Sequence, residues 1–162
     1  MKNKNMVTKP KIIDVEMASL EISSEPNILR SSGIGSCLVI TIYDIEKKIG
    51  GLAHVMLPNS NNASSYTNPN RFVDRAIEIM LEKIEKLGSK RTSLEAKVIG
   101  GASMFKVLST ESGGIGSQNI EAAKKKLAQE DIKVVSSATG GNSGRSVEFD
   151  LKTGLVTIKT RI

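Results

Sequence analysis

The residue types best suited to chemistry in this sequence are its single cysteine and its single histidine, Cys37 and His54. A thiolate is a strong nucleophile, but a free thiol has a pKa of about 8.5 and is mostly protonated at neutral pH. A nearby imidazole can take the thiol proton and later protonate a leaving group. The two residue types therefore predict nucleophilic catalysis, provided that the fold brings them into contact.

Two segments that are expected to form an antiparallel hairpin carry this cysteine and histidine. Residues 38–43 are almost entirely apolar and rich in β-branched side chains, which predicts a strand buried on both faces. Residues 49–57 predict the return strand. If residues 44–47 form the loop, Cys37 stands directly opposite His54, with Cβ atoms roughly 5 Å apart. A shift of two positions would keep both side chains on one face, whereas a shift of one would separate them.

The turn before Cys37 is rich in small residues, with Gly33, Gly35 and Ser36. Such a backbone is unhindered, so N–H groups near Cys37 are candidates for stabilising an oxyanion. The residues also have an ordinary structural interpretation, because a lone cysteine is often a small buried apolar residue and a lone histidine a core residue. Spacing alone favours that interpretation. Thiol reactivity separates the two, because an activated Cys37 would react with iodoacetamide well below about pH 8.

The composition indicates one α/β domain. The chain has 162 residues, 39% of them hydrophobic and 25% charged, which suits a single core. We expect residues 1–10 to form a flexible basic tail and residues 11–162 to form a single domain. Its pattern predicts about seven strands and two main helices, over residues 68–87 and from Gly116 or Ser117 onward. The predicted architecture is a layered sandwich with a mixed β-sheet.

Several classes of protein are disfavoured by the same composition. One cysteine excludes an intrachain disulfide, and one cysteine with one histidine cannot form a closed structural zinc site. No apolar run is long enough to span a membrane, and no apolar segment follows the basic N-terminus, so we expect a cytoplasmic protein without membrane insertion. The net charge of +6 admits nucleic acid or an acidic protein as a partner, but no basic and aromatic platform for bases is visible, so we expect no nucleic-acid binding.

Five motifs in register resemble those of the chemoreceptor glutamine deamidase family, CheD. The first two contain the cysteine and the histidine, and the other three include further glycine-rich stretches. The likeness extends in order over about residues 12–158. The motifs span residues 33–37, 50–58, 96–105, 115–119 and 139–147.

The resemblance implies hydrolysis of selected glutamine side chains on bacterial chemoreceptors and, in some members, of receptor glutamate methyl esters. It implies a fold like that of a toxin-type cysteine deamidase, a CheC-type phosphatase as partner, and no cofactor or metal. Carried over by position, Cys37 is the nucleophile and His54 the general base and acid. The family has a catalytic threonine six positions before the cysteine, where this chain has Ser31. Ser32 is an adjacent hydroxyl that could substitute, and a non-catalytic adaptor that binds the phosphatase is the alternative function.

Overall fold

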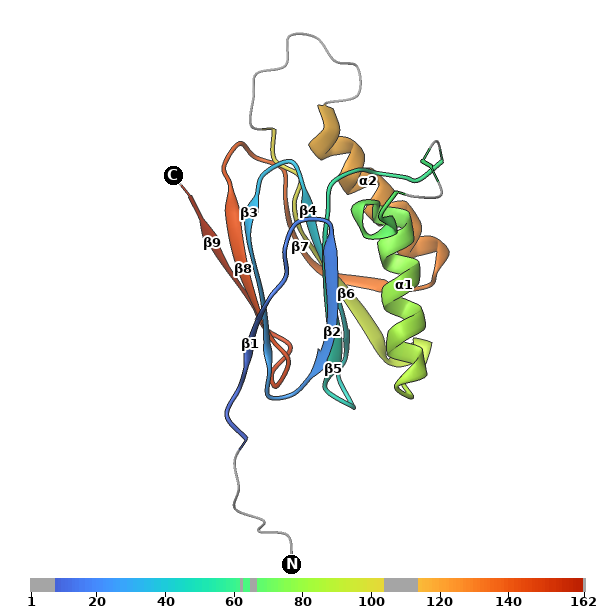
Figure 1. Cartoon of the computed structure of the whole chain (residues 1–162), viewed down its shortest axis with the longest axis vertical. Coiled ribbons are helices and arrows are strands. Elements are labelled where there is room, and N and C mark those ends of the chain that lie inside the picture. The colour runs from blue at the N-terminus through green and yellow to red at the C-terminus, as the bar shows by residue number, and fades with distance from the viewer. Residues whose placement is uncertain (1–7, 62, 65–66, 104–113, 162) are drawn as a thin grey trace, which may run out of the picture.

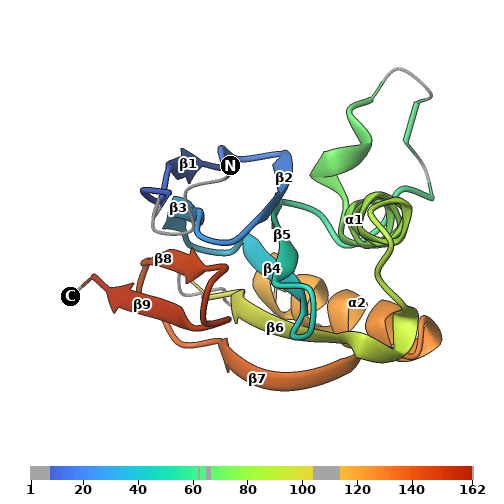
Figure 2. The same ribbon diagram turned by 90° about the horizontal axis from the view of Figure 1, so that it is seen from below.

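The computed structural model describes residues 8–61, 63–64, 67–103 and 114–161. Two β-sheets pack face to face, and two helices cover the outer face of one of them (Figure 1). The view from below shows the same three layers, which are the four-stranded sheet, the five-stranded sheet and the helices (Figure 2). The α/β sandwich with two main helices predicted from the sequence is confirmed, although its strands are divided between two sheets.

The described elements run in the following order. They are β1 (Ile12–Asp14), β2 (Ser19–Ser24), β3 (Ile28–Ile34), β4 (Leu38–Asp44), β5 (Ile49–Val55), the 3₁₀ turn Pro69–Arg71, α1 (Val73–Lys86), the 3₁₀ turn Arg91–Ser93, β6 (Leu94–Gly100), α2 (Gly114–Gln129), β7 (Lys133–Thr139), β8 (Arg145–Asp150) and β9 (Val156–Thr160).

Each sheet is mixed. The five-stranded sheet has the order β2-β5-β4-β6-β7, with a parallel pair between β6 and β7. The four-stranded sheet has the order β1-β3-β8-β9, with a parallel pair between β1 and β3. Strand β3 belongs to the second sheet and β4 to the first, so the short turn between them crosses from one sheet to the other.

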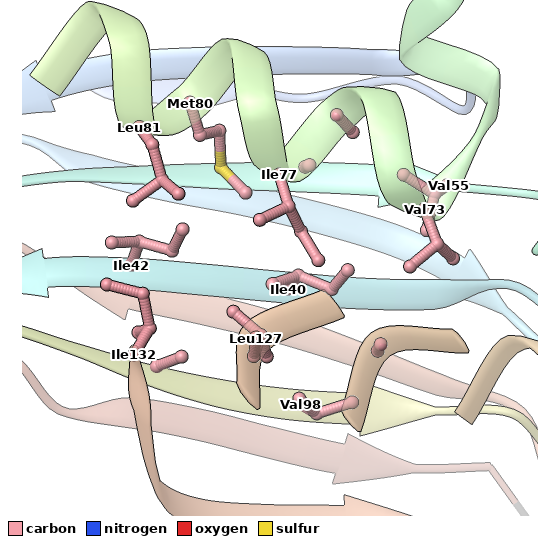
Figure 3. Packing of buried hydrophobic residues seen from close by; sticks show 14 of the residues in the cluster. Ile40, Ile42, Val55, Val73, Ile77, Met80, Leu81, Val98, Leu127 and Ile132 are labelled. Carbon is pink, nitrogen blue, oxygen red and sulfur yellow. The ribbon is translucent and has the colours of Figure 1, made fainter. Parts of the chain in front are cut away.

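The molecule has two apolar cores, one on each side of the five-stranded sheet. Strand β4 is buried along its whole length, as its continuous apolar run predicts. Its alternate side chains Ile40 and Ile42 pack against Ile77 and Met80 of α1 (Figure 3). Its other face, with Val39, packs against the four-stranded sheet. Side chains on this second face of β4 therefore point into the space between the two sheets.

The register of the β4–β5 hairpin differs by two positions from the predicted one. Asp44 belongs to the strand and pairs with Ile49, so Val39, and not Cys37, stands directly opposite His54. The side chain of Asp44 explains this register, because its Oδ1 accepts hydrogen bonds from the backbone N–H groups of the next turn residues at 2.9 and 3.0 Å. The shift preserves the face on which each side chain lies.

Two further predictions need correction. The apolar stripe of α1 is confirmed from Val73 to Ile84, but Leu87 lies beyond the helix end and is 56% exposed. Strand β2 was not predicted, because its sequence is polar except at Leu20 and Ile22. Of the predicted basic tail, residues 1–7 lie outside the described residues. Neither described helix is long and apolar enough to cross a membrane.

Candidate active site

The structure brings Cys37 and His54 to the same side of the five-stranded sheet. Cys37 directly precedes β4, where Leu38 pairs with Val55, and continuing this register by one residue makes His54 its diagonal neighbour. Val39 packs between the sheets and stands opposite His54, so the imidazole points into that space. Leu38 belongs to the core between the five-stranded sheet and the helices. Because successive residues point to opposite faces, Cys37 faces the space between the sheets, as His54 does. Both side chains are shielded from solvent, with 8% of Cys37 and 1% of His54 exposed.

Ser31 reaches the histidine from the opposite sheet and fixes its tautomer. Its hydroxyl donates to the carbonyl oxygen of Val15 at 2.7 Å, and the same Oγ lies 2.8 Å from His54 Nδ1. A hydroxyl has only one hydrogen, so Nδ1 must be the donor in the second contact. In the neutral ring Nε2 then carries no proton, and it has no hydrogen-bond partner within the described part of the chain. The ring thus holds a free base at Nε2.

The structure distinguishes the two adjacent serines. Ser31 is buried, with 3% of its surface exposed, and contacts the imidazole. Ser32 is exposed, because successive residues of a strand point to opposite faces. The hydroxyl that orients His54 is therefore that of Ser31, and the methyl group of a threonine is not needed for this hydrogen bond.

Burial favours the neutral form of both reactive groups. It raises the pKa of the Cys37 thiol above its ordinary value of 9.0, and the nearby backbone N–H of Cys37, which acts in the opposite direction, does not offset this. It lowers the pKa of His54 below 6.5. A thiolate–imidazolium pair is therefore disfavoured in the protein without substrate. Both shifts are opposite in direction to those that would favour a thiolate–imidazolium pair.

Alkylation of Cys37 by iodoacetamide is expected to be slow at pH 7 and to accelerate only as the pH rises above 9.0, because burial raises the pKa of this thiol. The rate can be followed by intact mass, with glutathione as an exposed reference thiol. Rapid labelling of the native protein near pH 6 would contradict a neutral resting pair. Since a neutral thiol is expected in an active enzyme as well, slow labelling does not identify an adaptor.

Two glycine-rich loops surround the backbone of Cys37. The N–H of Gly101 donates to the carbonyl oxygen of Cys37 at 2.9 Å. A Cβ at Gly100 would lie 2.5 Å from that same oxygen, and its φ of +113° is one that other residues rarely adopt, so glycine is required there. Gly140 in turn donates to the carbonyl oxygen of Gly100 at 2.9 Å. Both loops thus help to hold the Cys37 turn.

Asn119 of α2 is a site-supporting residue that the sequence interpretation did not single out. It is fully buried, and its Nδ2 donates at 3.0 Å to the carbonyl oxygens of Ser36 and of Met56. Ser36 directly precedes Cys37, and Met56 is two residues after His54. One amide therefore joins the helix to both strands where they carry the reactive side chains. The available sequence signals were a polar residue at an inward helical position and its place in the motif 115–119.

Replacing Asn119 with alanine is expected to lower the free energy of unfolding by about 1–3 kcal/mol, because the carbonyl oxygens of Ser36 and Met56 lose their shared donor. Urea denaturation measures the change. Lys124→Ala, on the exposed face of the same helix, is the matched control and should change stability by less than about 0.5 kcal/mol. Equal stabilities of the two variants would show that the Asn119 hydrogen bonds contribute nothing.

Metal-ligating side chains do not gather around this pair. Among the described residues, no three His, Cys, Asp or Glu side chains lie close enough together to hold a metal ion. The chemistry available to the described side chains is therefore that of a thiol, an imidazole and a hydroxyl.

Comparison with known proteins gives a consistent family relationship. The family model described as CheD chemotactic sensory transduction matches residues 56–160. The probable chemoreceptor glutamine deamidase CheD of Clostridium botulinum (strain Hall) is 45% identical over 151 residues, covering 93% of each chain. That of Clostridium novyi (strain NT) is 45% identical over 150 residues, covering 91% of this chain and 92% of the relative. Matches of this length necessarily span both Cys37 and His54.

Two solved structures share the fold at low sequence identity. The hypothetical protein YfiH of Bacillus licheniformis has a TM-score of 0.51 and 12% identity, and the match covers 76% of this chain and 51% of that one. A Neisseria meningitidis protein of the DUF152 family has a TM-score of 0.51 and 11% identity, with 81% and 64% covered. At these identities the likeness concerns the fold alone.

Proposed function

This chain belongs to the CheD family, and from that membership we propose that it is an amidohydrolase that converts glutamine side chains of bacterial chemoreceptors to glutamate. Its curated relatives carry the name of that activity. The observation that carries the proposal is the hydrogen bond between His54 Nδ1 and Ser31, which leaves Nε2 free to accept a proton. Cys37, on the same face, is the nucleophile that would supply it.

The first half of the reaction forms a thioester. Cys37 Sγ attacks the amide carbon of the substrate glutamine while its proton passes to His54 Nε2, so that charge develops only as the bond forms. The backbone N–H of Cys37 is a candidate donor to the resulting oxyanion. The imidazolium then protonates the amide nitrogen, the carbon–nitrogen bond breaks, and ammonia leaves. Ser31 accepts the Nδ1 hydrogen bond throughout and acts as a positioning residue.

The second half of the reaction regenerates the thiol. Water attacks the thioester carbon and gives a proton to His54 Nε2. The carbon–sulfur bond breaks, the imidazolium returns the proton to Cys37, and a glutamate side chain is released. The same sequence of steps would hydrolyse a glutamate methyl ester, with methanol as the leaving group in place of ammonia.

The direct test is to incubate the purified protein with the cytoplasmic domain of a chemoreceptor and to map glutamine-to-glutamate conversion by peptide mass spectrometry. We expect conversion at a few glutamines only, at a rate proportional to the amount of protein. A receptor domain that stays unmodified, while a homologous deamidase converts it, would overturn the proposal.

A CheC-type phosphatase is the proposed regulatory partner. It would compete with the receptor for this protein, so adding the purified phosphatase should slow receptor deamidation. The alternative function, an adaptor without catalysis, predicts binding of the phosphatase together with no conversion of the receptor.

A further inference from the structure

A pocket of about 740 Å³ opens beside the turn that leads to Cys37. Its walls come from Gly33 and Gly35 of that turn, from the loop between β7 and β8, and from Arg161 near the end of the chain. These segments meet at one end of the sandwich (Figure 1). Gly35 is two residues from Cys37, so the two Cα atoms lie within about 7 Å. The pocket is thus a neighbour of the nucleophile and distinct from the space that holds His54.

The pocket is lined by cations and hydrogen-bond donors. Arg145 and Arg161 contribute guanidinium groups, and the described lining contains serine hydroxyls but no aspartate or glutamate. Among the described side chains, no carboxylate pairs with either arginine. By contrast, Arg30 and Arg91 each pair with a carboxylate within hydrogen-bond distance. The described side chains thus leave the positive charge of this pocket without a paired carboxylate.

The Arg145 guanidinium has unused donor capacity. Its Nη2 donates to the carbonyl oxygen of Gly140 at 2.9 Å, while its Nη1 is buried and has no acceptor among the described residues. A buried donor without an acceptor costs free energy, and a carboxylate is the acceptor whose geometry matches the guanidinium fork. Arg145 also lines the pocket, so its guanidinium lies at the site where such a group would bind.

We propose that this pocket binds an acidic side chain of the receptor close to the target glutamine, and thereby selects which glutamines are deamidated. The proposal rests on the proposed function, since the ligand is part of the same substrate. Gly35 of the pocket wall lies within about 7 Å of Cys37 at Cα, so a carboxylate bound in the pocket would come from a residue near the target glutamine. The net charge of +6 favours an acidic partner in general.

The test compares two forms of a receptor cytoplasmic domain. One carries glutamate within four positions of a converted glutamine, and in the other those glutamates are replaced by glutamine. We expect the wild-type protein to convert the acidic form at least about tenfold faster at low substrate concentration, the effect of one charge-assisted contact. Arg161→Gln and Arg145→Gln should each reduce that preference, mainly through KM.

Two additions make the result decisive. Arg161→Glu, tested on a receptor form with lysine at the same neighbouring positions, should restore part of the lost rate. Arg75→Gln removes an equal charge from the exposed face of α1 and should leave the preference unchanged. Arg161 is exposed and lies outside the strands, so its variants are expected to fold even if Arg145→Gln does not.

Equal conversion of both receptor forms by the wild type would overturn the inference and leave the proposed function intact. Inhibition by inorganic phosphate without any preference between the forms would mean a site for a free anion, which also contradicts it. If neither form is converted, the proposed function itself fails and the inference fails with it.

Discussion

Replacing Cys37 with alanine is expected to lower the rate of receptor deamidation by at least about 10,000-fold, because no other described group near His54 can form the thioester. The residual rate would come from substrate binding and oxyanion stabilisation alone. Peptide mass spectrometry of the receptor domain, sampled over hours for the variant and minutes for the wild type, measures both rates.

The variant needs a control for folding, because Cys37 is buried beside the turn that joins the two sheets. Cys37→Ser keeps the side chain's shape and should be nearly as inactive, since a serine hydroxyl ionises far less readily than a thiol. Thermal unfolding of both variants near the wild-type midpoint shows that the fold is retained. A folded alanine variant that deamidates at the wild-type rate would exclude Cys37 as the nucleophile.

Replacing His54 with glutamine is expected to lower the deamidation rate by about 1,000-fold, because proton transfer to and from the substrate loses its base and acid. Glutamine fills much of the same volume, and its side-chain amide can donate to Ser31 in place of Nδ1. The comparison therefore removes Nε2 while disturbing the packing as little as the site allows. Ser31→Val, which removes the hydrogen bonds to His54 and Val15 but leaves Nε2 in place, should have a smaller effect.

The pH dependence gives a separate signature of His54. Burial lowers the pKa of this imidazole, so the base form persists below pH 6.5 and wild-type activity falls only as the pH drops through the lowered pKa. The residual activity of His54→Gln should lack that decline. An unchanged acid limb in the variant would mean that another group controls it.

The free energy of unfolding is also expected to depend on pH through the protonation of His54. The unfolded chain protonates its histidine at about pH 6.5, above the folded pKa, so the free energy of unfolding falls as the pH drops below that value. His54→Gln removes this contribution. Urea denaturation between pH 5 and pH 7 should therefore show a smaller loss of stability in the variant than in the wild type. The carboxylates titrate in both proteins, so their contribution cancels in this comparison.

The sequence predicted the shared face of the two reactive residues because strand parity survives a register shift of two positions. It did not predict the shift, which depends on the hydrogen bonds that the Asp44 carboxylate accepts from backbone N–H groups of the turn. The buried strand β4 and the helix α1 were predictable because their apolar patterns are long. The polar edge strand β2 was not, since only Leu20 and Ile22 of its six residues are apolar.

The candidate site was harder to anticipate where it depends on contacts between distant elements. Ser31 was assigned through the family resemblance, but its hydrogen bond to Val15, which decides the tautomer of His54, joins residues that no local pattern connects. Asn119 bridges Ser36 and Met56 from a third element. The neutral state of the thiol likewise follows from burial in the folded molecule rather than from residue type.

The covalent thioester on Cys37 is the central step of this account, and hydroxylamine tests it most directly. Hydroxylamine competes with water for a thioester, so adding it to the wild-type protein and a receptor domain should convert part of the target glutamine to its hydroxamate. The hydroxamate share should rise with hydroxylamine concentration, and none should form with Cys37→Ala. If the wild type yields only glutamate at every hydroxylamine concentration, water attacks the amide directly and the cysteine mechanism is contradicted.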